Sequence, residues 1–191
     1  MTIKEVADNC DYSARKEIDL TGLPTIRHYN LSMEAGIELA KKLGANVDIV
    51  RAGVALMDIK LGECAKNGKQ PEHVKASEEY ALKLLENFGV DEATKKVLLN
   101  CVAAHHGKVP FESLEAEIVA NADCYRFIHP RGVMSFHATA IKRGNDHDDA
   151  LKLVRAKLEE KHSILSLEAA KADLEPFYQM FSTIIKEGFD V

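Results

Sequence analysis

The chain has 191 residues, 46% of them hydrophobic and 29% charged, and its formal net charge is -5 at pH 7. This length gives room for one domain with a single hydrophobic core. Because the net charge is negative and Lys and Arg are scattered along the chain, the composition gives no electrostatic reason to expect nucleic acid or an anionic membrane as a partner.

The start of the chain and its cysteines predict a cytoplasmic protein. The first residues, MTIKEVADNC, lack the apolar core of a signal peptide, and no apolar run approaches the roughly 18 residues of a membrane span. The four cysteines lie far apart and form no C-x-x-C pair, so no zinc knuckle or redox motif is present: Cys10, Cys64, Cys101 and Cys124. We expect free thiols in a reducing compartment.

Apolar residues recur at helical spacing in almost every segment, which predicts an all-α fold. The alternation typical of strands is hard to find for more than a few residues. An apolar stripe from Met33 to Leu43 predicts a helix that ends at Gly44, which can adopt the left-handed conformation of a helix end. The segment 47–61 is apolar on nearly every face and predicts a central, buried helix.

Two further helices are predicted after a polar loop. Pro71 suits the first turn of a helix that runs to Phe88 and is closed by Gly89. Asp91 can cap the next helix, which ends near Gly107. The loops between these helices are short, so the helices are expected to be neighbours in one bundle.

The last part of the chain is expected to add helices to this bundle. Between His129 and His147 the periodicity weakens, and we predict loops at HPRG, residues 129–132, and at KRGNDHDD, residues 142–149. No linker rich in Pro, Gly or Ser separates the C-terminal helices from the rest. We therefore predict a single domain, residues 1–191, with a core at about 26–128 and a C-terminal helical extension at about 148–187.

Two carboxylates lie on apolar helical surfaces. Asp58 lies within the apolar run 47–61, and Asp123 is at helical spacing from Phe127. Two buried acids in one core repel each other, which raises a pKa unless a cation lies between them. We expect a divalent metal ion to be that cation. The alternative is a structural ion pair between Asp58 and a nearby arginine such as Arg51.

Four histidines complete the set of candidate metal ligands. His28 lies near the start of the first strong helix, His73 lies in the first turn after Pro71, and His105 and His106 close a helix. A helix N-terminus disfavours cationic imidazole by about 0.3–1 kcal/mol, which biases His73 towards the neutral form that binds metals. The alternative for His105 and His106 is a plain helix C-terminus, where cationic His is favourable.

Other polar residues are assigned simpler roles. The run 145–149 is interpreted as a capped loop that opens a helix near Ala150. Arg126 and Arg131 are weak candidates for phosphate contacts. Cys124 has no base and orienting group beside it in the sequence, so we expect it to pack as a small apolar side chain.

The order of these residues resembles the HD-domain superfamily of metal-dependent phosphohydrolases. The resemblance covers roughly residues 26–128 and rests on IRHYNLSMEAGIELAKKLG, HVKASEEYALKLL, VAAHHG and EIVANAD, with His28, Asp58, His73, His105, His106 and Asp123 in that order. It implies an all-helical core of about five helices. It also implies that His28, the His-Asp doublet and Asp123 hold a first metal ion, and that His73 and the His-His pair serve a second ion in dinuclear members.

The sequence departs from the family at the doublet. Met57 precedes Asp58 where the family has His, and Leu61 stands where the family frequently has Lys. A thioether is a soft ligand suited to copper(I), so Met57 is not expected to replace an imidazole on a harder metal. His28, Asp58 and Asp123 still resemble a facial triad with open positions, with an affinity lowered by at least ~10- to 100-fold.

We therefore expect a metal-dependent phosphohydrolase that acts on a small phosphorylated metabolite, with a nucleotide as the favoured class. The predicted metal ligands are His28, Asp58, Asp123, His73, His105 and His106, with one or two ions of Mn, Fe, Mg, Ni or Zn. Asp58 and His106 are the predicted catalytic residues. The alternative, motivated by Met57, is a catalytically inactive HD-like module that binds a ligand or regulates a partner. A homo-oligomer is compatible with either.

Overall fold

The computed structural model describes residues 1–188, and within this range the chain is helical and contains no strand. The elements are α1 (Ile3–Thr21), α2 (Ile26–Leu43), α3 (Val47–Met57), α4 (Leu61–Lys66), η1 (Gln70–Glu72), α5 (His73–Asn87), α6 (Glu92–Ala104), α7 (Leu114–Ile128), α8 (Pro130–Lys142), α9 (His147–Ile164) and α10 (Glu168–Gly188). The predicted all-α fold is confirmed. Residues 189–191 of the predicted domain lie outside the described range. None of the described helices has the length and hydropathy needed to span a membrane.

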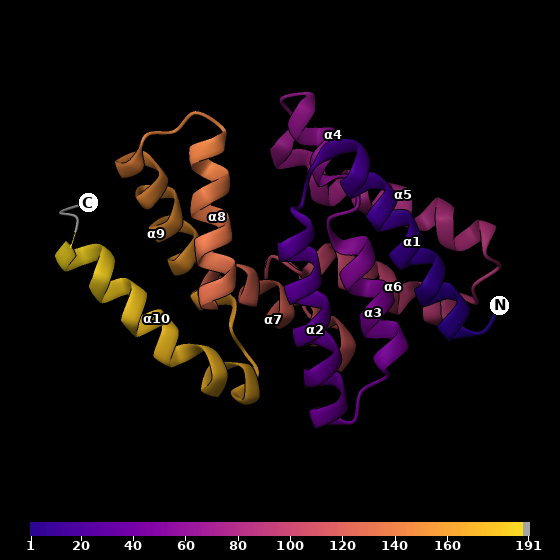
Figure 1. Ribbon diagram of the computed structural model, residues 1–191. Helices are drawn as coiled ribbons and strands as arrows, with labels where there is room; N and C mark the ends of the chain where they lie inside the picture. The colour runs from indigo at the N-terminus through magenta and orange to yellow at the C-terminus, as the bar shows by residue number, and fades with distance from the viewer. Residues whose placement is uncertain (189–191) are drawn as a thin grey trace.

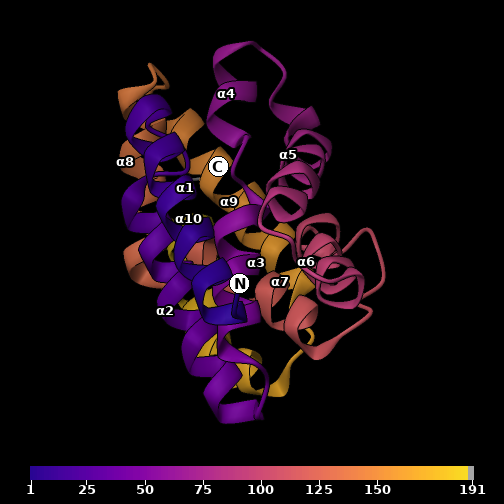
Figure 2. The same ribbon diagram turned by 90° about the vertical axis from the view of Figure 1, so that its right-hand side faces the viewer.

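Helix α7 lies at the centre of the molecule. Figure 1 shows α1 to α6 on one side of α7 and α8, α9 and α10 on the other. Figure 2, turned by 90°, shows α1, α2 and α8 on the opposite face from α5 and α6. Because α7 has neighbours on both sides, every residue from Ile118 to Ile128 is buried, and polar side chains on it face other protein groups.

The C-terminal helices share a hydrophobic core with the helices before them. Leu31 of α2, Val54 of α3 and Ile128 of α7 belong to the same buried cluster as Leu158 of α9 and Leu174 of α10. The predicted extension is therefore packed against the predicted core. The exact domain limits stay a prediction.

Several helix ends follow local signals in the sequence. Gly44 follows α2 with a φ of 72°, and Gly107 follows α6 with a φ of 69°, a conformation that glycine adopts without strain. The carboxylate of Asp91 accepts a hydrogen bond from Thr94 N at 3.0 Å at the start of α6. These caps are confirmed as predicted.

The central helix ends earlier than predicted. The apolar run 47–61 was expected to form one helix, but α3 ends at Met57 because the chain turns at Asp58, whose φ is -122° and ψ is 19°. The next helix, α4, then lies against the end of α1. A Cβ atom on Gly62 would lie 2.0 Å from Thr21 Oγ1, so only glycine permits this approach. The turn leaves the Asp58 carboxylate at the end of α3.

Two helices have no counterpart in the sequence prediction. Helix α1 begins with a capping box in which Thr2 and Glu5 each bond the other's backbone N–H. Helix α8 occupies the segment between the two predicted loops and includes 130–132 of the first, so the first loop prediction was wrong. The second predicted loop, 142–149, contains the non-helical residues 143–146 that separate α8 from α9. His129 caps α8 by accepting a hydrogen bond from Arg131 N at 3.2 Å, and Pro130 stands at the first helical position.

Candidate metal centre and adjoining pocket

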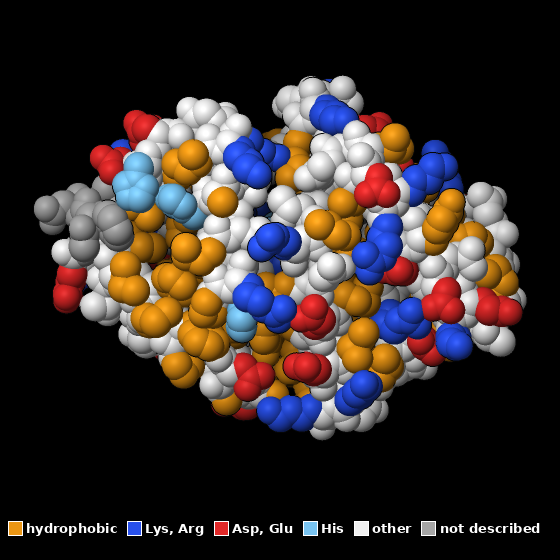
Figure 3. All heavy atoms as spheres, viewed as in Figure 1, with side chains coloured by type: hydrophobic (Ala, Val, Ile, Leu, Met, Phe, Trp, Pro, Cys, Tyr) orange, Lys and Arg blue, Asp and Glu red, His pale blue; other side chains and the backbone are white. Residues whose placement is uncertain are grey.

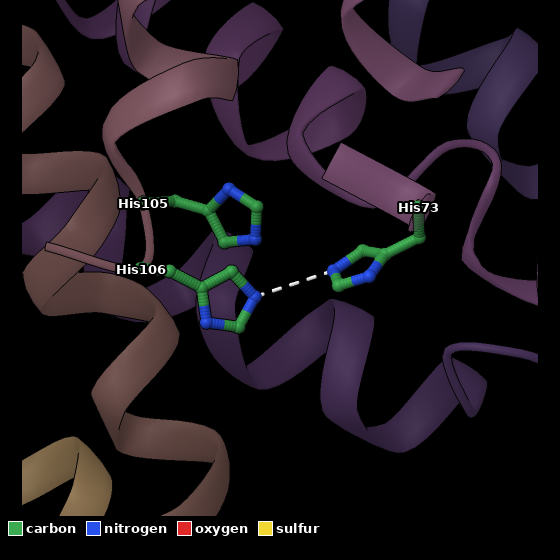
Figure 4. A group of neighbouring side chains, drawn as sticks. All are labelled: His73, His105 and His106. Carbon is green, nitrogen blue, oxygen red and sulfur yellow. Dashed lines mark hydrogen bonds between the residues drawn. The ribbon is translucent and has the colours of Figure 1, made fainter. Parts of the chain in front are cut away.

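Two helix ends bring three histidines together. His73 is the first residue of α5, directly after the η1 turn, and His105 and His106 follow the last residue of α6. Figure 4 shows the ring of His73 facing the rings of His105 and His106 across a gap. One nitrogen from each ring lies within 4.8 Å of the others, and His73 Nε2 is 3.2 Å from His106 Nε2. This spacing is close to that of ligand atoms around one metal ion.

Main-chain carbonyls fix the position of the proton on two of these rings. His73 Nδ1 lies 2.7 Å from the carbonyl oxygen of Gln70, and His105 Nδ1 lies 2.7 Å from that of Val102. A carbonyl can only accept, so each Nδ1 carries a hydrogen and donates it. In the neutral rings both Nε2 atoms then carry a lone pair. Burial lowers the pKa of His73, but Asp58 beside it outweighs burial and raises that pKa above its ordinary value, opposite to the bias expected from the helix N-terminus. Metal-binding histidines are oriented by the same kind of contact.

Asp58 adds an oxygen that faces these lone pairs. Its Oδ1 lies 3.2 Å from His73 Nε2 and 3.6 Å from His105 Nε2. Within residues 1–188, Asp58 Oδ1 and His105 Nε2 are buried without a hydrogen-bond partner. Converging acceptors are costly unless a cation lies among them, either a proton on an imidazole or a metal ion. The imidazole and carboxylate donors fit a divalent transition metal.

The second oxygen of Asp58 belongs to a buried group of four charges. Arg126 Nη1 donates to Asp58 Oδ2 at 2.5 Å and to Asp123 Oδ1 at 2.8 Å. Lys161 Nζ lies 2.6 Å from Asp123 Oδ2. All four side chains are buried. We call Asp58, Asp123, Arg126 and Lys161 the charge quartet.

The cation between the two carboxylates is therefore a guanidinium, whereas the sequence analysis expected a divalent metal ion. The structural partner suggested for Asp58 is also different, because Arg51 pairs with Asp8 at 2.6 Å and with Asp48 at 2.8 Å. Arg126 was considered only as a weak phosphate contact. Its position three residues after Asp123 puts both side chains on one face of α7, which is the sequence signal for this pair.

The charge quartet holds its members in their ionised forms. Burial alone raises the pKa of Asp58 and of Asp123, but Arg126 beside Asp58, and Lys161 with Arg126 beside Asp123, bring both pKa values below their ordinary range. Burial lowers the pKa of Arg126 and Lys161, and the adjacent carboxylates more than reverse this effect. At neutral pH the quartet thus carries two negative and two positive charges.

His28 is close to the charge quartet but bonds elsewhere. Its Nε2 donates to the carbonyl oxygen of Gly132 at 3.0 Å, and its ring contacts Phe127 and Phe136. Burial, followed by the charge of Arg126, lowers the pKa of His28 to about 4, so the ring is neutral. Met57, the residue before Asp58, is 2% exposed and packs in the hydrophobic core.

His106 connects the histidine cluster to α9. Its Nδ1 lies 3.2 Å from Lys161 Nζ and 3.5 Å from Glu160 Oε1. Burial lowers the pKa of His106, Glu160 opposes this, and His105 and Lys161 lower the pKa further. The net effect favours neutral imidazole at neutral pH, and the neutral ring can bind a metal or accept a proton.

A cavity of about 320 Å³ adjoins the histidine cluster. Its wall combines cationic, aromatic and apolar side chains with the candidate ligands: Arg143, Lys157, Lys161, Arg126, Phe127, Phe136, Leu153, His28, His73, His106, Asp58 and Asp123. This combination suits an anionic ligand that also has a planar or apolar part. A separate hollow between α2 and α8 is lined by Arg27, Arg131 and Lys142, and Figure 3 shows Lys and Arg side chains gathered along that boundary.

The structure thus divides the six predicted metal ligands into two groups. Three histidines lie together and Asp58 Oδ1 faces two of them, His73 and His105, whereas His28 and Asp123 bond other partners. The roles of all six residues in metal binding stay predictions. Sequence reasoning missed Lys161 and Glu160, since nothing local shows that α9 brings them to the end of α6.

No protein-family model matches the chain. Among curated proteins, Ribonuclease Y of Streptococcus agalactiae is 32% identical over 129 residues, which is 67% of this chain and 22% of that protein. Ribonuclease Y of Fusobacterium nucleatum is 31% identical over 105 residues, which is 55% of this chain and 19% of that protein. The chain therefore spans about a fifth of the length of the curated relatives it matches.

Solved structures show the fold. A predicted HD superfamily hydrolase from an uncultured Thermotogales bacterium matches with a TM-score of 0.63 and 20% identity, over 96% of this chain and 91% of that one. Bacillus subtilis YpgQ in complex with ADP matches with a TM-score of 0.71 and 19% identity, over 100% of this chain and 97% of that one. The chain has the all-helical HD-domain fold, and the predicted fold class is confirmed.

Proposed function

We propose that this protein is a metal-dependent phosphohydrolase that acts on a small phosphorylated metabolite, with a nucleotide as the favoured class. The observation that carries the proposal is the convergence of Asp58 Oδ1 with the Nε2 atoms of His73 and His105 beside a cavity with cationic walls. The comparisons support it, because YpgQ was crystallised with ADP and Ribonuclease Y is named for an RNA substrate, and both ligands contain nucleotide phosphate groups.

His73, His105, His106 and Asp58 Oδ1 are the residues that would hold the ion. Three nitrogen donors suit Mn, Fe, Ni or Zn better than Mg, which prefers oxygen ligands. A divalent cation at this cluster supplies Lewis-acid polarisation of a phosphoryl oxygen and makes water acidic enough to attack near neutral pH. The remaining requirements of the reaction fall on the protein's own residues.

The cavity wall supplies the binding groups. Arg143 and Lys157 place positive charge beside the cluster, which favours a phosphate. Phe127 and Phe136 offer aromatic surfaces against which a nucleobase can pack. Asp58 Oδ1 has a second lone pair besides the one that would face the ion, and this lone pair can accept a hydrogen bond from the attacking water and orient it.

His106 lies where it can accept the proton that hydrolysis releases. Its Nδ1 faces Glu160 Oε1 at 3.5 Å, and attraction from His106, Lys157 and Lys161 outweighs burial and lowers the pKa of Glu160 to about 2. When the His106 ring does not itself hold the ion, a proton that reaches its Nδ1 meets the ionised carboxylate of Glu160, which offsets the repulsion from Lys161 Nζ at 3.2 Å.

Metal analysis tests the proposal. Protein purified without chelator is expected to contain about one equivalent of divalent metal and to release phosphate from nucleotide substrates until a chelator is added. The His105→Ala variant is expected to lose the metal. His162→Ala, which removes an imidazole of α9 that pairs with Glu175 of α10, is expected to keep it. Protein that takes up no metal in excess and hydrolyses nothing would favour the inactive binding module.

The cationic wall leads to a second expectation. Arg143→Ala is expected to raise the KM for a phosphorylated substrate about tenfold without changing the metal content, because a charged hydrogen bond to phosphate contributes about 1.5 kcal/mol. Lys142→Ala is the matched control, since Lys142 is the neighbouring residue but lines the hollow between α2 and α8. Steady-state kinetics at fixed metal concentration distinguish the two. Equal KM values for both variants would place the phosphate elsewhere.

A further inference from the structure

We infer that Arg126 is a built-in substitute for a metal ion: its guanidinium takes the cation position between Asp58 and Asp123. The protein then holds one metal ion, at the histidine cluster, and Asp123 and His28 are not ligands. This inference goes beyond the proposed function and rests on it only for the metal ion at the histidine cluster. It changes the expected number of metal ions and two of the expected ligands.

The first support is spatial. Arg126 Nη1 lies 2.5 Å from Asp58 Oδ2 and 2.8 Å from Asp123 Oδ1. A divalent ion that bridged these oxygens would lie about 2.0–2.6 Å from each of them, in the volume that this nitrogen occupies. The guanidinium and an ion therefore exclude each other at this position.

The second support is charge. The two carboxylates carry two negative charges, and Arg126 together with Lys161 carries two positive charges, so the buried group is neutral. A divalent ion added there would bring uncompensated positive charge into a buried region, which is strongly unfavourable. At the histidine cluster Asp58 Oδ1 faces the imidazoles of His73 and His105, and Lys161 contacts the cluster at His106 Nδ1.

The third support is that, within residues 1–188, neither His28 nor the residue before Asp58 offers a nitrogen ligand to an ion between Asp58 Oδ2 and Asp123 Oδ1. The Nε2 atom of His28 donates to Gly132, and Met57 packs in the hydrophobic core. The donors that remain are carboxylate oxygens bonded to Arg126, and these oxygens become available to an ion such as Mn²⁺ only when the guanidinium is removed. By fixing Oδ2 of Asp58, Arg126 turns Oδ1 towards His73 and His105, so it acts as a positioning residue for the ion that the histidines hold.

The number of bound ions tests the inference. Elemental analysis after saturation with Mn²⁺ and desalting is expected to give about one equivalent for the wild type, about one for Asp123→Asn and none for His105→Ala. Asp123→Asn removes a charge from the quartet but no ligand from the cluster. Two equivalents in the wild type, or loss of an equivalent in Asp123→Asn, would overturn the inference.

The role of Arg126 is tested in a variant whose histidine cluster no longer binds metal. In the His105→Ala background, adding Mn²⁺ is expected to leave the Tm unchanged. In His105→Ala with Arg126→Met, the same addition is expected to raise the Tm by at least roughly 2 °C, because the freed carboxylates then bind the ion. No rise in the double variant would refute the exclusion of metal by Arg126. If the double variant does not fold, the inference is tested by the equivalents of Mn²⁺ that the wild type and Asp123→Asn bind.

These outcomes separate the inference from the proposed function. A wild type that binds no metal would contradict the proposed function, and a Tm rise seen only when Arg126 is replaced would still support the inference. A wild type that binds two ions would contradict the inference and leave the proposed function intact.

Discussion

Replacing Lys161 with methionine is expected to lower the free energy of unfolding at pH 7 by about 3–5 kcal/mol. Lys161 is 1% exposed, and its ammonium lies 2.6 Å from Asp123. Methionine preserves most of the side-chain volume, so the loss comes from a buried carboxylate deprived of one cation rather than from a cavity. Urea unfolding followed by helical circular dichroism measures the change.

Lys157→Met is the matched control for this variant. Lys157 is on the same helix one turn earlier, 34% of its side chain is exposed, and it pairs with Glu160. An exposed pair of this kind contributes about 0–1 kcal/mol. If both variants lost the same free energy, the buried charge quartet would not contribute to stability as argued.

The stability difference should also depend on pH. The folded-state pKa of Asp123 is below its unfolded value of about 3.9, so its pairing stabilises the fold above that pH and is lost as the pH falls through the folded-state pKa. The folded-state pKa of Lys161 is raised above about 10.4, so its contribution is lost as the pH rises through the folded-state value. The difference between wild type and Lys161→Met should therefore be largest between about pH 4 and 10 and decrease outside that window.

Helix ends with local chemistry were predictable from sequence. Gly44 and Asp91 act through bonds within a few residues of themselves, so their roles do not depend on the rest of the fold. The end of α3 was not predictable in this way. The run to Leu61 is apolar enough to continue as a helix, and the turn at Asp58 is supported by a hydrogen bond from Lys60 N to Ser77 on another helix. Tertiary contacts overrode the local pattern there.

The candidate site shows the same division between local and distant information. Sequence reasoning identified the two buried acids and the histidine cluster, because residue type and spacing reveal them. It expected a metal ion between the acids, although Arg126 was visible on the same face of α7 as Asp123. Lys161 could not be assigned, because its partner is 38 residues away in the sequence and is brought close only by the packing of α9 on α7.

Asp58→Asn is expected to lower kcat/KM for the proposed phosphohydrolase reaction at least about 10³-fold, equivalent to about 4 kcal/mol of transition-state stabilisation, and to remove most of the bound metal. The carboxylate serves both parts of the site, since Oδ1 faces His73 and His105 and Oδ2 bonds Arg126. The amide carries no charge for the ion and leaves Arg126 with a single carboxylate partner. Metal content and kcat/KM at saturating metal concentration measure the two losses.

Asp48→Asn controls for the loss of a carboxylate from α3. Asp48 is in the first turn of that helix and pairs with Arg51 near the surface at 2.8 Å, far from the histidine cluster in sequence and without a contact to it. Its replacement is expected to change kcat/KM less than about threefold, because a partly exposed pair contributes little to stability and nothing to the reaction. Circular dichroism of both variants shows whether they are folded at the assay temperature. A folded Asp58→Asn protein that keeps its metal and its activity would mean that neither metal binding nor the reaction uses this carboxylate.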